Sequence, residues 1–284
     1  MNIILCAGIS VRSGTNYIGS VFSEINTVDS LPKNTSKGEF PFFPDKTYKH
    51  YKKWIENFQS TFFVKPNIDE KSFAPYFAEA FKNYLKNEYD LNQNNLFLKC
   101  PSLYNLERFY DFFPDGKLII LTRSAPDLIA SSLKASLLIR KSQPLKKKIK
   151  SRIKYHTGYN MYQYSKAYVK HTNQLLKLRK ELKGRYLEVK YEDIVESPEE
   201  NIKQMLEYAS VDYSEEELQN AINAKVVGSS YYGSKKNTQN WGKLDKTKDF
   251  KSIGRYESWN FFNRFIFNQI AKESNSKVGY NHSL

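Results

Sequence analysis

Cysteine and histidine are scarce in this chain, with two and four copies among 284 residues. Two cysteines make no disulfide framework, and neither Cys6 nor Cys100 has the spacing of a zinc ligand. Both lie in short apolar runs that predict strands, so we expect buried, free thiols. Because the histidines also lack a metal-ligand spacing, the sequence predicts no metal site.

Long apolar runs are absent as well. No stretch is apolar over enough residues to cross a bilayer as a helix, so no membrane span is expected. The first expected strand begins at residue 2, which leaves no room before it for a signal peptide or an anchor. Together these features predict a cytoplasmic protein.

Charged and aromatic residues, by contrast, are plentiful. The chain has 44 Lys and Arg against 30 Asp and Glu, a net charge of +14. Hydrophobic residues make up 40% and aromatic residues 15%, which excludes a disordered chain. The positive charge fits a coat of solvated lysines or a polyanionic partner, such as nucleic acid, an acidic glycan, a membrane surface or a charged nucleotide. Charge alone does not decide among these.

Expected strands and helices alternate along the chain. Short apolar runs predict buried strands at 2–8, 95–101, 117–123 and 185–194. Helical spacing and capping residues predict helices at 15–25, 46–58, 73–89, 102–116, 125–141, 155–182, 197–209, 214–224 and 256–273. Loops are expected at 29–46, at the basic run 143–154 and at 226–255. The alternation predicts an α/β fold: a single three-layer domain over residues 1–284, with a mainly parallel sheet flanked by helices.

The stretch GISVRSGTNYIGSVF, residues 8–22, follows the first strand and is similar to a phosphate-binding loop. It is not a Walker A motif: five residues separate Gly8 from Gly14, and Arg12 precedes the second glycine where a Lys should follow it. A strand, a tight loop and a helix still place N–H groups and a partial positive charge where an anion can bind.

The strand 117–123 leads into a second anion-binding pattern. In RSAPDLIASS, Arg123 ends the strand and Ser131 follows two helical turns into the next helix, so both side chains can reach one anion. Ligands of parallel sheets bind at the carboxyl ends of the strands. The two patterns therefore predict two anion pockets on one edge of the sheet.

These motifs resemble those of the sulfotransferases that use 3′-phosphoadenosine 5′-phosphosulfate (PAPS). VRSGT is similar to the family's 5′-phosphosulfate loop, and LIILTRSAPDLIAS to its 3′-phosphate motif. LEVKYEDIVESPEENIKQMLEYASV resembles the strand and helix that follow, and FKSIGRYESW the C-terminal segment that closes over the nucleotide. The motifs come in the family's order and are closest in style to those of carbohydrate sulfotransferases.

The resemblance implies a P-loop-like phosphosulfate-binding loop, PAPS as co-substrate and no metal. It implies a core over 1–225 and a nucleotide-closing loop and helix over 226–273. The residues that it assigns to the nucleotide are Arg12, Ser13, Gly14, Thr15, Asn16, Arg123, Ser131, Tyr191, Lys251 and Arg255. Among them, Tyr191 would lie near the adenine, and Lys251 and Arg255 would reach the 3′-phosphate.

Catalysis in such an enzyme rests on in-line positioning and charge stabilisation. The resemblance assigns Arg12 to the charge that develops on the bridging oxygen, and Lys99 to the sulfonate group. Cytosolic small-molecule members have a His two residues after this Lys, where the present chain has Pro101.

The general base is therefore sought elsewhere. KGEFPFF resembles a stretch that carries a catalytic Glu in members acting on glycans, which makes Glu39 the expected base, with His50 and Asp45 in reserve. The Glu-type base, the missing His and the basic surface favour a carbohydrate acceptor. A lipid-linked or small polar acceptor stays open.

Two other functions are open at this point. A P-loop-type nucleotide or small-molecule kinase needs a Lys after Gly14 and a Mg²⁺-binding acid at a strand end; the first is absent and no convincing second is found. A non-enzymatic polyanion-binding module would use the net charge and the run 143–154, but leaves Arg123 and Ser131 unexplained. The resemblance favours an enzyme without a nucleic acid partner.

Overall fold

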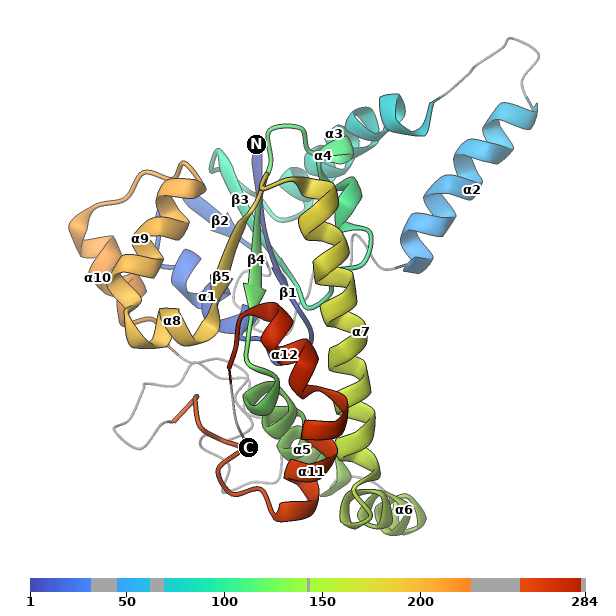
Figure 1. The fold of residues 1–284 in the computed structure, drawn as a ribbon. Helices are drawn as coiled ribbons and strands as arrows, with labels where there is room; N and C mark the ends of the chain where they lie inside the picture. The colour runs from blue at the N-terminus through green and yellow to red at the C-terminus, as the bar shows by residue number, and fades with distance from the viewer. Residues whose placement is uncertain (32–44, 62–68, 142–143, 226–250, 282–284) are drawn as a thin grey trace.

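A computed structural model of the chain describes residues 1–31, 45–61, 69–141, 144–225 and 251–281. Within these ranges five strands form one sheet, in which every neighbouring pair is parallel. They are β1 (Asn2–Gly8), β2 (Val28–Ser30), β3 (Asn95–Cys100), β4 (Lys117–Thr122) and β5 (Leu187–Lys190), in the order β2-β3-β1-β4-β5. Figure 1 shows the sheet in the middle of the molecule, between two groups of helices.

Each group of helices closes one face of the sheet. One face is covered by α1 (Thr15–Phe22), α8 (Tyr191–Glu196), α9 (Pro198–Tyr208) and α10 (Glu215–Ile222). The other group comprises α2 (Asp45–Thr61), α3 (Glu70–Glu88), α4 (Phe109–Phe112), α5 (Ala125–Lys141), α7 (Tyr159–Leu182), α11 (Phe261–Ile270) and α12 (Lys272–Val278). A further helix, α6 (Leu145–His156), lies between α5 and α7 in the chain, at the lower end of Figure 1.

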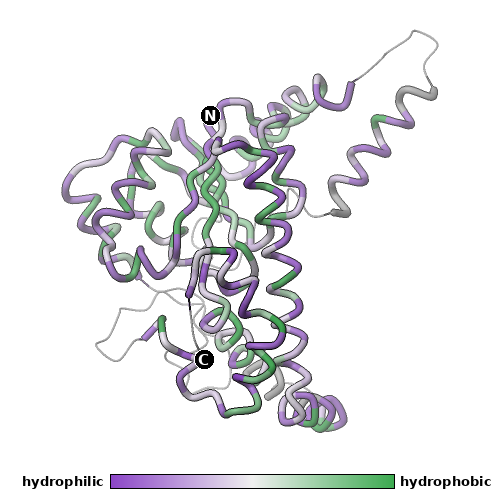
Figure 2. The backbone as a smooth tube through the Cα atoms, in the orientation of Figure 1, coloured by the Kyte–Doolittle hydropathy of each residue, from purple (hydrophilic) through white to green (hydrophobic). Residues whose placement is uncertain are grey.

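The central strand β1 shows why both faces need a cover. Ile3, Leu5 and Ala7 belong to the hydrophobic cluster on one face, and Ile4 and Cys6 to the cluster on the other. Successive side chains of a strand point to opposite faces, so a continuous apolar run needs helices on both. Figure 2 shows the hydrophobic strands inside and a mixture of hydrophilic and hydrophobic residues along the outer helices. The predicted α/β class with a parallel sheet and flanking helices is confirmed.

The register of β1 and β4 determines which loops meet. Gly8, the last residue of β1, is paired with Leu121 near the end of β4, and Ile9 N–H donates to the Leu121 carbonyl at 2.9 Å. The loop after β1 and the turn after β4 therefore leave the sheet side by side, as ligand-binding loops of parallel sheets do.

Several local expectations were wrong. The basic run 143–154 is helical over Leu145–His156 rather than a loop, since Lys, Arg and Leu are good helix formers and Pro144 precedes the first turn. Strand β5 ends at Lys190, where α8 begins, so it is shorter than 185–194. The final helix is divided at Ala271 into α11 and α12.

Two further differences concern the first half of the chain. Asp29 and Ser30, expected to begin a loop, belong to the short edge strand β2 beside β3. The expected helix 102–116 is reduced to a 3-10 turn over Leu106–Arg108 followed by α4. Within the described ranges, none of the helices combines the length and the apolar character that a membrane span requires.

The proposed division of the chain at residue 225 stays a prediction, because 226–250 lie outside the described residues.

Candidate active site at the carboxyl ends of β1 and β4

The loop between β1 and α1 is closed by its own hydrogen bonds. Ser13 Oγ donates to the Ser10 carbonyl at 2.6 Å and accepts from Ser10 N–H at 3.1 Å. Arg12 and Gly14 have positive φ angles of 73° and 110°, which turn the chain sharply into α1. Gly14 precedes Thr15 as the N-cap and brings no side chain to the first N–H groups of the helix. This helix end is therefore suited to an anion.

Gly14 also allows Tyr191 to approach the loop. A Cβ atom at Gly14 would lie 2.4 Å from the Tyr191 ring, which is closer than atoms can come. The ring belongs to the first residue of α8 and is buried. Tyr191, assigned by resemblance to the nucleotide, therefore lies against the loop that is assigned to the phosphosulfate.

Arg123 joins this cluster from the end of β4. Its guanidinium lies over the Tyr191 ring at 4.5 Å, and its Nη1 donates to the Arg12 carbonyl at 2.8 Å. The Nη2 atom donates to the Ser252 carbonyl at 2.5 Å. The side chain is only 3% exposed, and its Nε atom is buried with no hydrogen-bond partner in the part of the chain that the structure describes. Such a cation is suited to a buried anionic ligand.

The two sequence motifs meet in one contact. Arg12 Nε donates to Ser131 Oγ at 3.2 Å, across 119 positions of the chain. Ser131 lies in α5 and is 1% exposed. The first loop and the first turns of α5 thus form one polar cluster rather than two distant pockets.

Lys99 lies on the neighbouring strand, β3. It is 5% exposed, passes along Gly19 of α1, and its Nζ donates to the side-chain oxygen of Asn16. Asn16 and Lys99, which the resemblance assigns separately to PAPS, are therefore in direct contact at the start of α1. Burial raises the pKa of the nearby Cys6 thiol to about 12, which keeps it protonated and unreactive at neutral pH.

The segment from Lys251 to Arg255 lies against the same strand end. Arg255 N–H donates to a carboxylate oxygen of Asp127 at 2.7 Å, and Gly254 N–H donates to the other at 3.2 Å. The Arg255 side chain donates to the Lys251 carbonyl at 3.0 Å, while Lys251 is exposed. The main-chain bonds to Asp127, and the bond from Arg123 to the Ser252 carbonyl, place this segment beside the site.

Sequence reasoning missed the buried polar residues that hold this segment and the turn after β4. Asp127 is fully buried in the first turn of α5, and Glu192 accepts hydrogen bonds from Ser124 N–H at 3.0 Å and from Tyr280 Oη at 2.8 Å. Asn275 accepts from Ala125 N–H at 2.8 Å. Only the acidic residue directly after Pro126 in the first helical turn could have pointed to this network.

Of the candidates for the general base, Asp45 and His50 lie among the described residues. Glu39 lies outside the described residues, and so does the KGEFPFF stretch around it. Asp45 is the first residue of α2, and His50 is exposed on the same helix. Their roles stay predictions.

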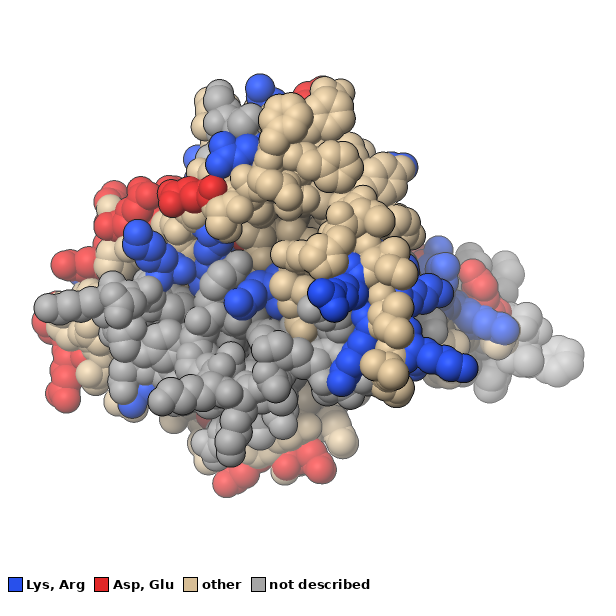
Figure 3. Space-filling model, turned by 90° about the horizontal axis from the view of Figure 1, so that it is seen from below, with Lys and Arg blue, Asp and Glu red and all other residues tan. Residues whose placement is uncertain are grey.

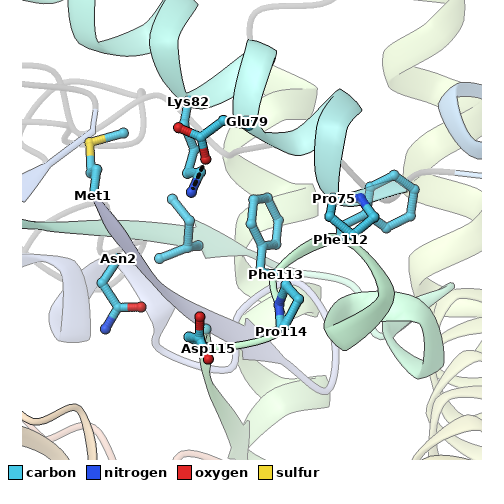
Figure 4. Close-up of a pocket in the computed structure, with 11 residues that line it drawn as sticks. Met1, Asn2, Pro75, Glu79, Lys82, Phe112, Phe113, Pro114 and Asp115 are labelled. Atoms are coloured by element: carbon cyan, nitrogen blue, oxygen red, sulfur yellow. Dashed lines mark ion pairs between the residues drawn. The ribbon is translucent and has the colours of Figure 1, made fainter. Parts of the chain in front are cut away.

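The hollow drawn in Figure 4 is not part of this site. It measures about 490 Å³ and is lined by residues such as Met1, Pro75 and Phe113. Figure 4 also shows the ion pair of Glu79 and Lys82 at its edge, with an N–O distance of 2.5 Å. Met1 precedes β1, so this hollow lies at the opposite edge of the sheet. Among the described residues, no group of three or more His, Cys, Asp and Glu side chains could hold a metal.

Fold and site together define an α/β protein in which two polar elements suited to anions meet at the carboxyl edge of a parallel sheet. A family model described as "Sulfotransferase family" matches residues 9–215. Because the match covers most of the chain, this protein belongs to the sulfotransferase family and is an enzyme of sulfonate transfer, as the resemblance predicted.

Solved sulfotransferases share the fold. Mouse sulfotransferase SULT7A1 complexed with PAP has a TM-score of 0.52 and 11% identity, over 98% of this chain and 85% of that chain. The sulfotransferase from Alicyclobacillus acidocaldarius has a TM-score of 0.50 and 12% identity, over 100% and 97%. The sulfotransferase domain of the Synechococcus PCC 7002 olefin synthase has a TM-score of 0.50 and 16% identity, over 99% and 96%. A sequence search among curated proteins gives no match.

Proposed function

We propose that this enzyme transfers a sulfonate group from PAPS to a hydroxyl acceptor. The observation that carries the proposal is the hydrogen bond from Arg12 to Ser131, because it joins the loop suited to a phosphosulfate to the helix suited to a 3′-phosphate. The kinase alternative loses its support, since the family is that of sulfotransferases and no Lys follows Gly14. A purely polyanion-binding role is set aside for the same reason.

The residues present fit PAPS on chemical grounds. Arg123 is a buried cation that forms no ion pair within the described part of the chain and keeps an unsatisfied Nε donor. Arg123 and Ser131 would hold the 3′-phosphate, with Lys251 and Arg255 beside it. The first N–H groups of α1, with Ser13, Gly14, Thr15 and Asn16, would hold the 5′-phosphosulfate. Tyr191, next to both, would lie against the adenine.

PAPS supplies an activated sulfonate group, and the protein supplies positioning and charge. Arg12 would stabilise the negative charge that grows on the bridging oxygen as the bond to sulfur breaks. Lys99, held by Asn16 at the start of α1, would neutralise the sulfonate oxygens. Both cations are fixed before the substrates arrive, which lowers the cost of reorganisation.

A base must accept the proton of the acceptor hydroxyl. We propose Glu39 for this role, with Asp45 and His50 as the other candidates. Glu39→Gln, Asp45→Asn and His50→Gln separate these candidates. The variant that removes the true base should lower kcat by about 100-fold or more and leave the nucleotide affinity unchanged. A Glu39→Gln enzyme with full activity would reject Glu39.

The proposed acceptor is a carbohydrate. The support is the Glu-type stretch KGEFPFF and Pro101 in the place of a His. A panel of sugars, phenols and lipid-linked alcohols with labelled PAPS tests this, and turnover of phenols alone would overturn it.

The first experiment is calorimetric titration with 3′,5′-adenosine bisphosphate (PAP), in EDTA. The parent protein should bind it without metal, and Arg123→Ala should weaken binding by about 100-fold, because a charge-assisted contact in a buried site is lost. Arg185→Ala is the matched control, since Arg185 also lies over a tyrosine ring, that of Tyr110 at 4.0 Å, but before β5 at the other edge of the sheet. Binding of ATP with Mg²⁺ and not of PAP would overturn the proposal.

A further inference from the structure

Helix α6 turns its apolar side chains toward solvent. Leu145, Ile149 and Ile153 follow one another at intervals of four residues and are 73%, 54% and 58% exposed. Residues four apart lie on one face of a helix, so they form a single apolar stripe. Tyr155 instead packs against the hydrophobic core. A surface helix normally buries such a stripe, so this arrangement calls for a partner outside the fold.

The stripe is framed by positive charge. The basic residues of α6 are Lys146, Lys147, Lys148, Lys150, Arg152 and Lys154. The sequence of the helix, LKKKIKSRIKYH, contains no acidic residue. Figure 3, which views the molecule from below, shows basic side chains on both sides of an uncharged strip in the region of α6, with acidic side chains toward the rim.

Exposed aromatic residues continue the apolar surface on α11. Phe261, Phe262 and Phe265 are 83%, 50% and 50% exposed. Phe262 of α11 packs against the turn that follows α6: a Cβ atom at Gly158 would lie 2.5 Å from its ring. Figure 1 shows α6 and α11 close together at the lower end of the molecule. We call the surface of Leu145, Ile149, Ile153, Phe261, Phe262 and Phe265 the α6–α11 face.

We propose that the α6–α11 face docks on an anionic lipid bilayer. An exposed stripe of Leu, Ile and Phe framed by Lys and Arg is the pattern of a helix that lies in the membrane interface, with its apolar side in the acyl region and its cations among the headgroups. Each basic residue near an anionic surface adds to the attraction.

Charge decides between this occupant and two others. A second copy of the chain would bring another set of lysines against the first, and like charges oppose such contact. A nucleic acid would satisfy the lysines but leave the apolar centre unused. An anionic bilayer can pair its headgroups with the basic residues and bury the apolar stripe among its acyl chains. The proposal concerns binding only, so it does not depend on the identity of the nucleotide or the acceptor.

The test is sedimentation of the whole protein with vesicles of phosphatidylcholine, with and without added phosphatidylserine. The parent should bind the phosphatidylserine vesicles and lose binding as salt rises, because exposed charges are screened. Ile149→Ser with Ile153→Ser should lower the partition coefficient by more than about tenfold, since two apolar side chains no longer enter the acyl region. Lys146→Glu with Lys150→Glu should lower it by a similar factor.

Matched controls come from α3, at the other end of the molecule. Tyr76 and Tyr84 are 74% and 58% exposed, so Tyr76→Ser with Tyr84→Ser removes comparable apolar surface elsewhere. Lys71→Glu with Lys86→Glu makes the same change of charge on exposed residues of that helix. Both controls should bind vesicles as the parent does, and equal thermal unfolding of all variants shows that the fold is intact.

Three outcomes would overturn the proposal. One is equal binding of vesicles with and without phosphatidylserine, and another is equal loss in the α3 controls. The third is a parent protein that does not bind vesicles but forms a dimer, with Ile149→Ser and Ile153→Ser together making it monomeric. The α6–α11 face would then be an interface between copies.

Discussion

The two elements that we propose to bind anions are held in different ways. The loop after β1 closes on itself through Ser10 and Ser13, three residues apart. The end of β4 instead depends on partners that come much later in the chain. Tyr168 donates to the Arg123 carbonyl at 3.2 Å, and the Ser252 carbonyl accepts from the Arg123 guanidinium. The first element is a local structure, whereas the second requires the tertiary fold.

The difference concerns buried polar groups above all. At the end of β4, Asp127 and Glu192 are carboxylates that are almost wholly buried, and main-chain and hydroxyl donors satisfy them. Such networks stabilise a unique arrangement only while every member has a partner. Removing one member should therefore cost more here than in the loop after β1.

The largest effect is expected for Asp127→Ala. Gly254 and Arg255 would lose their acceptor, and we expect the free energy of unfolding to fall by about 3 kcal/mol. PAP affinity should fall as well, because the segment beside Arg123 is released. Asp127→Asn keeps one oxygen acceptor and should lose about half as much. Urea denaturation measures both, and equal stability of parent and Asp127→Ala would contradict the account.

A substitution in the loop after β1 should destabilise the protein through a steric clash. In Gly14→Ala a Cβ atom meets the Tyr191 ring at 2.4 Å, on top of the cost of a positive φ, so we expect a loss of about 2 kcal/mol. Gly184 has a φ of 79° and open space around its Cβ position, so Gly184→Ala carries the backbone cost alone.

The control for this prediction is the double variant Gly14→Ala with Tyr191→Ala. It should be less destabilised than the sum of the two single variants, because the clash is gone. Strict additivity of the three measurements would show that the ring does not press on the loop.

A smaller effect is expected where the two elements join. Ser131→Ala removes the acceptor of Arg12 Nε, which should lower PAP affinity about fivefold with little change in stability. Ser132 is buried one residue further along α5 and donates to the Leu128 carbonyl at 2.9 Å. Ser132→Ala should therefore leave PAP affinity unchanged in the same titration, and equal losses would refute a specific role for Ser131.

The smallest effect is a dependence on alkaline pH. Burial, with the charge of Glu192 adding to it, raises the pKa of Tyr280 far above its ordinary value. In the unfolded chain this phenol ionises near pH 10, so its contribution to stability is complete below about pH 10 and is lost as pH rises further.

Tyr280→Phe should be less stable than the parent near pH 8 by about 1 kcal/mol, because the bond to Glu192 is lost. Its stability should also fall less steeply above about pH 10. Part of the fall should remain, since burial also raises the pKa of Tyr17 to about 12. Tyr76→Phe, on an exposed ring, is the control. Parallel curves for parent and Tyr280→Phe would disprove the contribution of Tyr280.

Local patterns gave the fold and part of the site. The apolar run 2–8 is β1 and the segment 125–141 is α5 with the expected bounds, because strand burial and helix capping act over neighbouring residues. The predicted neighbours Arg12, Arg123 and Ser131 lie together for a similar reason: each follows the carboxyl end of a buried parallel strand.

Other features depend on distant contacts. Asp127 accepts hydrogen bonds from residues 127 and 128 positions away, and Glu192 bonds to Tyr280 across 88 positions. No short pattern encodes such pairings. Helix α6 was missed because its lysines suggested a solvated loop, although Leu145, Ile149 and Ile153 already had helical spacing. The edge strand β2 is three residues long, too short for a period of two to be recognised.

The hydroxyl of Tyr280 has a consequence for the synthesis of the protein. It lies 3.3 Å from the Thr122 hydroxyl, yet a ribosome adds it 158 residues later. Until then the end of β4 lacks the groups that complete it, even though β1 and its loop have long been made. A domain generally folds as a unit. The end of β4 can therefore be completed only after the last helix has been translated and has docked.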